Sequence, residues 1–139
     1  MQPINLQINA IQHIGIPVTD IKASEAFYSR LGFANVMRAG FTDGGQPGTC
    51  IMMQRVAMII ELYQLPEHAL GEIRNRKNGH IDHVAFDVPD IDAAFATLKH
   101  AGFNMLEPEP VFLQFWERGC RYFNITGPDG ERLEFNQKL

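Results

Sequence analysis

The stretch HIGIPVTDIKASEAFYSRLGF, residues 13–33, occurs twice in the chain in related form. Shifted by 70 positions, it aligns without a gap with HVAFDVPDIDAAFATLKHAGF, residues 83–103, and eight of the 21 aligned pairs are identical. Similarity within a chain at a fixed interval indicates a duplicated structural unit. The sequence therefore predicts two modules of one fold. The identical pairs are His13/His83, Val18/Val88, Asp20/Asp90, Ile21/Ile91, Ala23/Ala93, Ala26/Ala96, Gly32/Gly102 and Phe33/Phe103.

Each copy has the pattern of a strand followed by a helix. β-Branched and aromatic residues at 11–18 and 81–88 favour strands. Asp20 and Asp90 then stand where a helix N-cap belongs, because a carboxylate there accepts backbone N–H groups. Gly32 and Gly102 are placed to end the helices. Apolar residues at helical spacing are predicted to face the core: Ile21, Phe27 and Leu31 in the first helix, and Ile91, Phe95 and Leu98 in the second.

Three more strands are expected after each helix, so each module has the order βαβββ. A second internal match, MIIEL (58–62) over ERLEF (131–135), aligns Glu61 with Glu134 at an interval of 73. The predicted class is α+β, with two tandem βαβββ modules. The expected strands cover about 34–41, 48–54 and 57–64, then 104–107, 120–126 and 131–137, with TGPDGE (126–131) as a tight turn.

The whole chain, residues 1–139, is predicted to be a single domain made of these modules. Module 1 covers about 10–64, a polar linker covers 65–79, and module 2 covers about 80–139. The segment EPEPVFLQFWERG (107–119) is expected to be a long aromatic-rich loop, and long loops often carry function.

Composition narrows the possible partners. The net charge is −4 and no run of Lys and Arg stands out, which disfavours nucleic acid. The apolar stretches are too short for a membrane span, and the beginning of the sequence does not resemble a signal peptide. Two cysteines, Cys50 and Cys120, form no disulfide framework. We therefore expect a cytoplasmic protein with reduced thiols that binds neither nucleic acid nor membrane.

One His on the first strand and one Glu on the last strand recur in both halves. His13 precedes Glu61 by 48 residues, and His83 precedes Glu134 by 51. If first and last strands are neighbours, each His and Glu can share a face, and a two-fold arrangement of the modules would bring all four together. Two imidazoles and two carboxylates suit Zn, Ni, Co, Mn or Fe. A lone His in a strand is usually an ordinary core or surface residue, so the repetition carries the metal hypothesis.

The motifs FYSRLGF, MIIELY, HVAFDVPDIDAA and TGPDGERLEF together resemble the vicinal oxygen chelate superfamily, over roughly residues 11–137. Within it they look most like the glyoxalase I (lactoylglutathione lyase) branch. The resemblance implies that the two modules form a curved mixed sheet, a half-barrel, around a metal site. It implies one divalent metal ion per site, held by His13, Glu61, His83 and Glu134. It also implies a homodimer, and glutathione or another thiol as cosubstrate.

The function implied by this resemblance is that of a metal-dependent lyase or isomerase acting on a small-molecule substrate. It moves a proton next to a carbonyl through a metal-stabilised enediolate, with Glu134 as the first candidate for the base and Glu61 as the second. Alternatives are a methylmalonyl-CoA epimerase-like enzyme or a sugar-derivative isomerase. Further alternatives in the superfamily are a small-molecule sequestering protein and a ring-cleaving dioxygenase, which uses two His and one Glu.

Some positions depart from the family pattern or have no counterpart. FYSRLGF is one residue shorter than the usual family motif. Arg38 and Arg118 are candidates for substrate binding by their loop position, or are solvated surface charges. His80 has no counterpart, since position 10 is Ala, and is expected to be a linker residue or a hydrogen-bond donor to a metal ligand. The aromatic residues Phe112, Phe115 and Trp116 are expected either to cover the substrate or to pack over the sheet edge.

Overall fold

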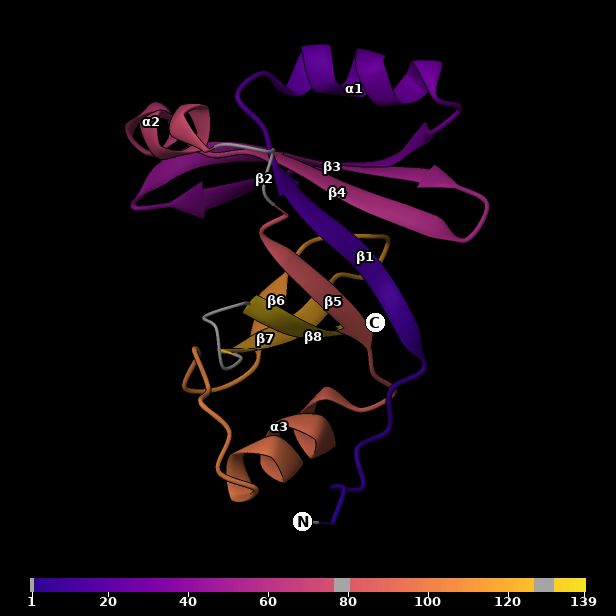
Figure 1. Ribbon diagram of the computed structural model, residues 1–139, viewed down its shortest axis with the longest axis vertical. Coiled ribbons are helices and arrows are strands. Elements are labelled where there is room, and N and C mark those ends of the chain that lie inside the picture. The colour runs from indigo at the N-terminus through magenta and orange to yellow at the C-terminus, as the bar shows by residue number, and fades with distance from the viewer. Residues whose placement is uncertain (1, 77–80, 127–131) are drawn as a thin grey trace. The chain divides into compact units, whose positions relative to one another are not determined.

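The computed structural model describes residues 2–76, 81–126 and 132–139, which form two compact units (Figure 1). One unit is His13–Asp82, and the other combines Met1–Gln12 with His83–Leu139. His80 and most of the predicted TGPDGE turn lie outside the described residues.

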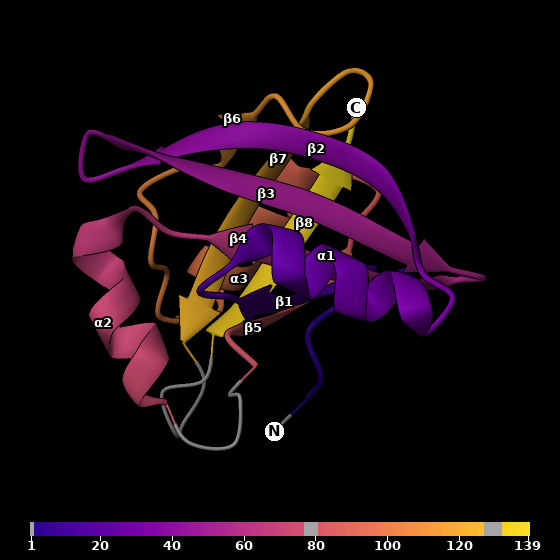
Figure 2. The same ribbon diagram turned by 90° about the horizontal axis from the view of Figure 1, so that it is seen from above.

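The unit His13–Asp82 contains a four-stranded sheet in the order β2-β3-β4-β1. Its last strand β4 runs parallel to β1, whereas β2, β3 and β4 pair antiparallel. The helix α1 follows β1 and lies over this sheet (Figures 1 and 2). The elements are β1 (Ala10–Pro17, in this unit from His13), α1 (Ile21–Arg30), β2 (Ala34–Asp43), β3 (Gln46–Arg55), β4 (Met58–Gln64) and α2 (Glu67–Asn75).

The other unit repeats this plan with the strand order β5-β8-β7-β6. Here β8 is parallel to β5 and antiparallel to β7, and α3 packs on β7 and β8. The first strand, helix and three later strands of each half confirm the βαβββ prediction and the α+β class. The elements are β5 (His83–Asp87), α3 (Ile91–His100), β6 (Val111–Leu113), β7 (Cys120–Thr126) and β8 (Arg132–Lys138).

The ends of α1 and α3 follow the sequence signals. Asp20 accepts hydrogen bonds from the N–H groups of Lys22 and Ala23, and Asp90 accepts one from Ala93 N, all at 3.0 Å. Gly32 and Gly102 come just after the helices with φ of +88° and +81°, a conformation that a residue without Cβ adopts without strain.

Both helices also share a hydrogen bond at their first residue that was not predicted from the sequence. Gln64 Oε1 accepts from Ile21 N at 2.8 Å, and Gln137 Oε1 accepts from Ile91 N at 3.0 Å. Each Gln therefore ties the last strand of its module to the first N–H of its helix. The signal was present in the sequence, because a Gln follows three residues after both aligned glutamates.

The prediction of which residues of the first helix face the core was wrong in part. In α3 the buried residues are Ile91, Ala94 and Leu98, and Phe95 is half-buried. In the first module, however, Phe27 of α1 is 56% exposed, and Leu31, which directly follows α1, is 49% exposed. The helix instead turns Ile21 and Tyr28 to the sheet, the positions that align with Ile91 and Leu98. The common N-cap fixes where each helix starts, and therefore which residues one and two turns later face inward.

The structure also differs from the predictions for two segments, the strand expected at 104–107 and the linker 65–79. The strand expected at 104–107 is only an isolated bridge between Met105 and Ile125, and the outer strand is β6 within 107–119. The pairing with β7 does not continue beyond this bridge, because the Glu107 side chain accepts a hydrogen bond from Asn124 N at 2.6 Å. That backbone N–H is the donor that a longer strand would need for its next hydrogen bond to β7. The predicted linker 65–79 contains the helix α2, which buries Leu70 and Ile73.

The helix anchors give a stability prediction. Gln64→Ala should lower the free energy of unfolding by about 1 kcal/mol, because Ile21 N loses its acceptor at a half-buried position. Gln64→Glu keeps the acceptor and places a negative charge near a helix N-terminus, so it should lose less. Urea denaturation of the two variants and the wild type measures the difference; equal midpoints for Gln64→Ala and wild type would contradict the anchoring role.

Candidate metal centre

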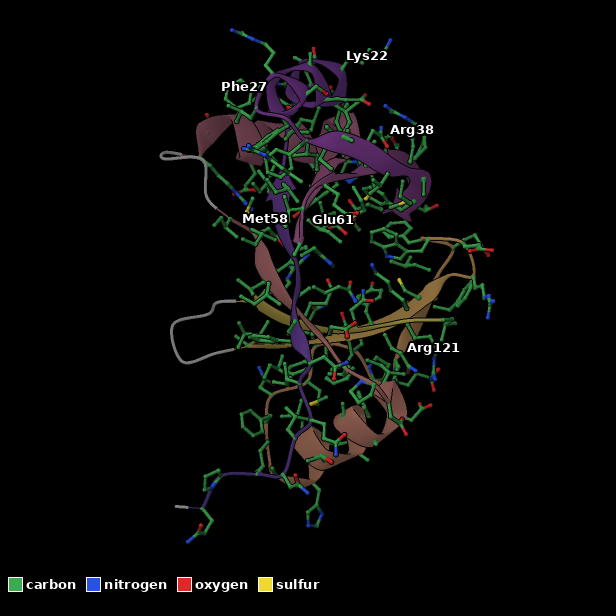
Figure 3. All side chains as sticks on the ribbon, turned by 90° about the vertical axis from the view of Figure 1, so that its right-hand side faces the viewer. Lys22, Phe27, Arg38, Met58, Glu61 and Arg121 are labelled. Atoms are coloured by element: carbon green, nitrogen blue, oxygen red, sulfur yellow. The ribbon has the colours of Figure 1, made fainter. Side chains whose placement is uncertain are left out.

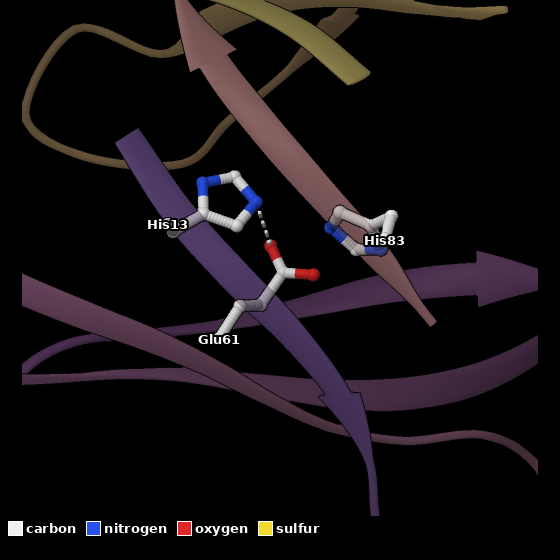
Figure 4. Close-up of side chains that lie close together, drawn as sticks. All are labelled: His13, Glu61 and His83. Atoms are coloured by element: carbon white, nitrogen blue, oxygen red, sulfur yellow. Dashed lines mark ion pairs between the residues drawn. The ribbon is translucent and has the colours of Figure 1, made fainter. Parts of the chain in front are cut away.

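The first His–Glu pair follows from the parallel pairing of β1 and β4. Gly15 lies opposite Glu61, and His13 precedes Gly15 by two residues, so both side chains are on one face of the sheet. His13 Nε2 and Glu61 Oε2 are 3.5 Å apart, and the His13 side chain is fully buried (Figure 4). Figure 3 shows Glu61 on the opposite side of this sheet from Lys22 and Phe27 of α1.

The second pair repeats this geometry between β5 and β8. Ala85 lies opposite Glu134, and His83 precedes Ala85 by two residues. His83 Nε2 and Glu134 Oε2 are 3.3 Å apart, and both side chains are buried. The sequence-based expectation that first and last strands are neighbours, with His and Glu on one face, is confirmed in each unit. The same two atoms, Nε2 and Oε2, face each other in both pairs.

Glu134 is held by a polar network that the sequence did not indicate. Asn136 Nδ2 donates to Glu134 Oε1 at 2.8 Å, and Asn136 Oδ1 accepts from Gln12 Nε2 at 3.0 Å. Gln12 Nε2 also lies 3.2 Å from Asp87 Oδ1. Because Gln12 supplies the donor, the Asn136 amide must turn its own nitrogen to Glu134. The carboxylate is thus fixed with Oε1 on Asn136 and Oε2 towards His83.

Burial raises the pKa of Glu134, since the charged carboxylate loses hydration. His83 and the hydrogen bond from Asn136 act in the opposite direction by favouring the charged form, whereas the Glu107 carboxylate favours the neutral one. A carboxyl group with a raised pKa is a stronger base once it is ionised, which suits it to taking a proton from a substrate.

The donor set fits a divalent metal ion. Each unit presents one imidazole nitrogen and one carboxylate oxygen on a buried face, and a buried carboxylate needs a positive partner, either a protonated imidazole or a cation. Two such pairs would supply the mixed N/O ligands that Zn, Ni, Co, Mn and Fe accept. That His13, Glu61, His83 and Glu134 serve one ion remains a prediction.

The candidates for substrate binding lie in different surroundings. Arg38 pairs with Ile51 in β3, so it is on the α1 side of the sheet, opposite to Glu61, where it forms an ion pair with Glu25. Arg118 is exposed. This placement does not support a substrate role for Arg38, and the role of Arg118 remains a prediction.

The aromatic candidates differ in exposure. Phe115 is buried, whereas Phe112 is 52% exposed. Trp116 has a left-handed backbone, with φ of +65°, and Lys138 Nζ lies 3.6 Å from its ring centroid. The Trp116 ring is therefore held by a cation–π contact to the end of β8. Covering of a substrate by Phe112 and Trp116 stays a prediction.

Comparison with known proteins now identifies the family. Residues 10–135 match the model of the Glyoxalase/Bleomycin resistance protein/Dioxygenase superfamily. The chain belongs to this superfamily. Among curated proteins, it is 32% identical to the uncharacterized protein YwbC of Bacillus subtilis, over 92% of this chain and 97% of that protein.

Solved structures share the fold of this superfamily member. Methylmalonyl-CoA epimerase of Streptomyces coelicolor matches with a TM-score of 0.76 and 22% identity, over 96% of this chain and 99% of the other. The epimerase of Mycobacterium tuberculosis matches with a TM-score of 0.77 and 19% identity, over 99% and 93%. A hypothetical protein of Bacillus halodurans gives 0.73 and 25%, over 93% and 94%. These structural matches confirm the predicted α+β fold, and the match to the family model confirms the predicted superfamily.

Two further expectations from the sequence concern the cysteines and membrane spans. Cys50 and Cys120 are both buried, and neither of them forms a disulfide bond. Of the helices in the described parts of the chain, none has the length and apolar character that crossing a membrane requires. The cytoplasmic location remains a prediction.

The raised pKa of Glu134 predicts a pH effect on chelator-treated protein. In the unfolded chain the carboxyl group has its ordinary pKa of 4.5, so it loses its proton at a lower pH than the folded one does. Over the pH range in which only the folded carboxyl is still protonated, the free energy of unfolding falls as pH rises. Glu134→Gln cannot titrate, so its free energy of unfolding should fall less than that of the wild type above about pH 4.5. Urea denaturation at a series of pH values measures both slopes; parallel slopes would contradict a raised pKa.

Proposed function

We propose that this protein is a metal-dependent lyase or isomerase that transfers a proton next to a carbonyl group. The observation that carries the proposal is the repeated His–Glu pair, on adjacent parallel strands of each unit with the same facing atoms. One divalent ion held by His13, Glu61, His83 and Glu134 would act as a Lewis acid on substrate oxygens. A protein that only sequesters a ligand has no need of two buried carboxylates.

Glu134 is proposed as the base. Its pKa is raised by burial, and Asn136 fixes one of its oxygens, so the carboxylate is presented in one orientation. It would remove the carbon-bound proton and return it to the same carbon or to its neighbour. Glu61 is the symmetry-related second candidate, and its place in the register is the same.

Two reactions of this type are proposed as candidates. Isomerisation of the hemithioacetal of a 2-oxo aldehyde with glutathione or another thiol, as in lactoylglutathione lyase, returns the proton to the adjacent carbon. Epimerisation of methylmalonyl-CoA delivers a proton to the same carbon from the opposite face, and the fold similarity to epimerases favours testing this reaction in parallel. A sugar-derivative isomerase would use the same residues. We further propose that the protein acts as a homodimer.

Metal analysis tests the shared site. Wild-type protein should bind one divalent ion per site, and His13→Ala or His83→Ala should each weaken binding by at least about tenfold, because each removes a ligand. His68→Ala is the matched control, since His68 is half-exposed and pairs with Asp43. Calorimetric titration with Zn, Ni and Co measures the affinities. If both ligand variants bound like the control, one shared site would be ruled out.

The role of the base is tested by Glu134→Gln and Glu61→Gln in metal-loaded protein. Glu134→Gln should lower kcat by about 100-fold or more in protein that still holds metal, because the amide keeps an oxygen for the ion but cannot accept the proton. Glu61→Gln should lower kcat less, and the exposed Glu67→Gln should leave it unchanged. Assays with a hemithioacetal and with methylmalonyl-CoA cover both reactions. Full turnover by Glu134→Gln would remove it from the role, and metal binding without turnover of either substrate would favour a sequestering protein.

A further inference from the structure

A buried oxygen without a partner lies beside the proposed base. Asn124 is opposite Glu134 in the antiparallel pair β7–β8, so the two side chains are on the same face of the sheet. Asn124 is 5% exposed, and its Oδ1 atom has no hydrogen-bond partner among the described residues. Buried polar atoms are nearly always paired in native proteins, so an orphan on this face needs an explanation.

The orientation of the Asn124 amide is fixed by Glu107. Glu107 Oε2 accepts from Asn124 N at 2.6 Å, and Glu107 Oε1 accepts from Asn124 Nδ2 at 2.9 Å. A carboxylate can only accept, so the amide nitrogen must face Glu107 and the amide oxygen must face away from it. Rotating the amide would place two oxygens against each other. The orphan is therefore held in place by the protein.

The repeated fold does not require an amide at this position. In the unit His13–Asp82 the residue opposite Glu61 is Met52, which is buried and apolar. The corresponding place in a βαβββ module is thus filled without a polar atom. The Glu107–Asn124 pair is a feature of one unit alone, on the face that also carries the proposed base.

We infer that Asn124 is a specificity-determining residue, whose Oδ1 accepts a hydrogen bond from a hydroxyl group of the bound ligand next to Glu134. This inference rests on the proposed function and names a ligand feature that the function alone does not require. Ligands with a hydroxyl beside the carbonyl satisfy the orphan oxygen. Ligands that lack a donor there leave it unpaired and bind more weakly.

Glycolate and methoxyacetate are matched probes for this hydrogen bond. Both present two neighbouring oxygens, but only glycolate has a hydroxyl donor. In cobalt(II)-loaded wild-type protein, changes in the visible spectrum during titration should show glycolate binding about tenfold more tightly. Asn124→Leu removes the acceptor at similar size, so the preference should disappear while cobalt remains bound.

A double variant keeps the inference testable if Asn124→Leu does not fold. The double variant Glu107→Gln/Asn124→Asp keeps the net charge, lets the new amide donate to the new carboxylate, and leaves an acceptor oxygen at position 124. It should retain the preference for glycolate. Equal binding of both probes to cobalt-loaded wild type, or an unchanged preference in Asn124→Leu, would overturn the inference alone. Failure of the wild type to take up cobalt would overturn the proposed function and this inference with it.

Discussion

The parallel pairing of the first and last strand in each unit is the constraint on which the site depends. Parallel neighbours need a long connection between them, and here the helix and two intervening strands provide it. In return, a His near the start of one strand faces a Glu on its neighbour, with Gly15 and Ala85 as the small residues across from the glutamates. The chemistry of each half is therefore set by strand register rather than by a loop.

The two halves share this frame but differ in what surrounds the carboxylate. Glu134 has Asn136 two residues along its strand and Asn124 across from it, whereas Glu61 has Tyr63 and Met52 at the matching places. One half of the duplication thus offers amides around its carboxylate, and the other offers a phenol and a thioether. A pseudo-symmetric fold can in this way give two equivalent carboxylates different surroundings.

The repeat made most of the fold and the His–Glu pairs predictable, because capping and strand periodicity are local signals that recur at the same interval. The same alignment places Tyr28 over Leu98 and so contains the correct face of α1, although the hydrophobicity of Phe27 and Leu31 favoured another. The network of Gln12, Asn136 and Glu134 joins residues 124 positions apart in sequence, and no local pattern reveals it. Likewise the end of the ladder at Glu107 depends on one side chain replacing a backbone acceptor.

The Glu-x-x-Gln spacing on β4 and β8 has a consequence for how the chain tolerates change. Three residues along a strand lead to the opposite face, so the same short segment carries a carboxylate on one side and the helix anchor on the other. A one-residue insertion between them would bring both to the same side, and no shift of the strand could restore both contacts. The hydrogen bond to the helix therefore fixes the alignment of the strand. Among related proteins, insertions and deletions should be rarest within these four residues.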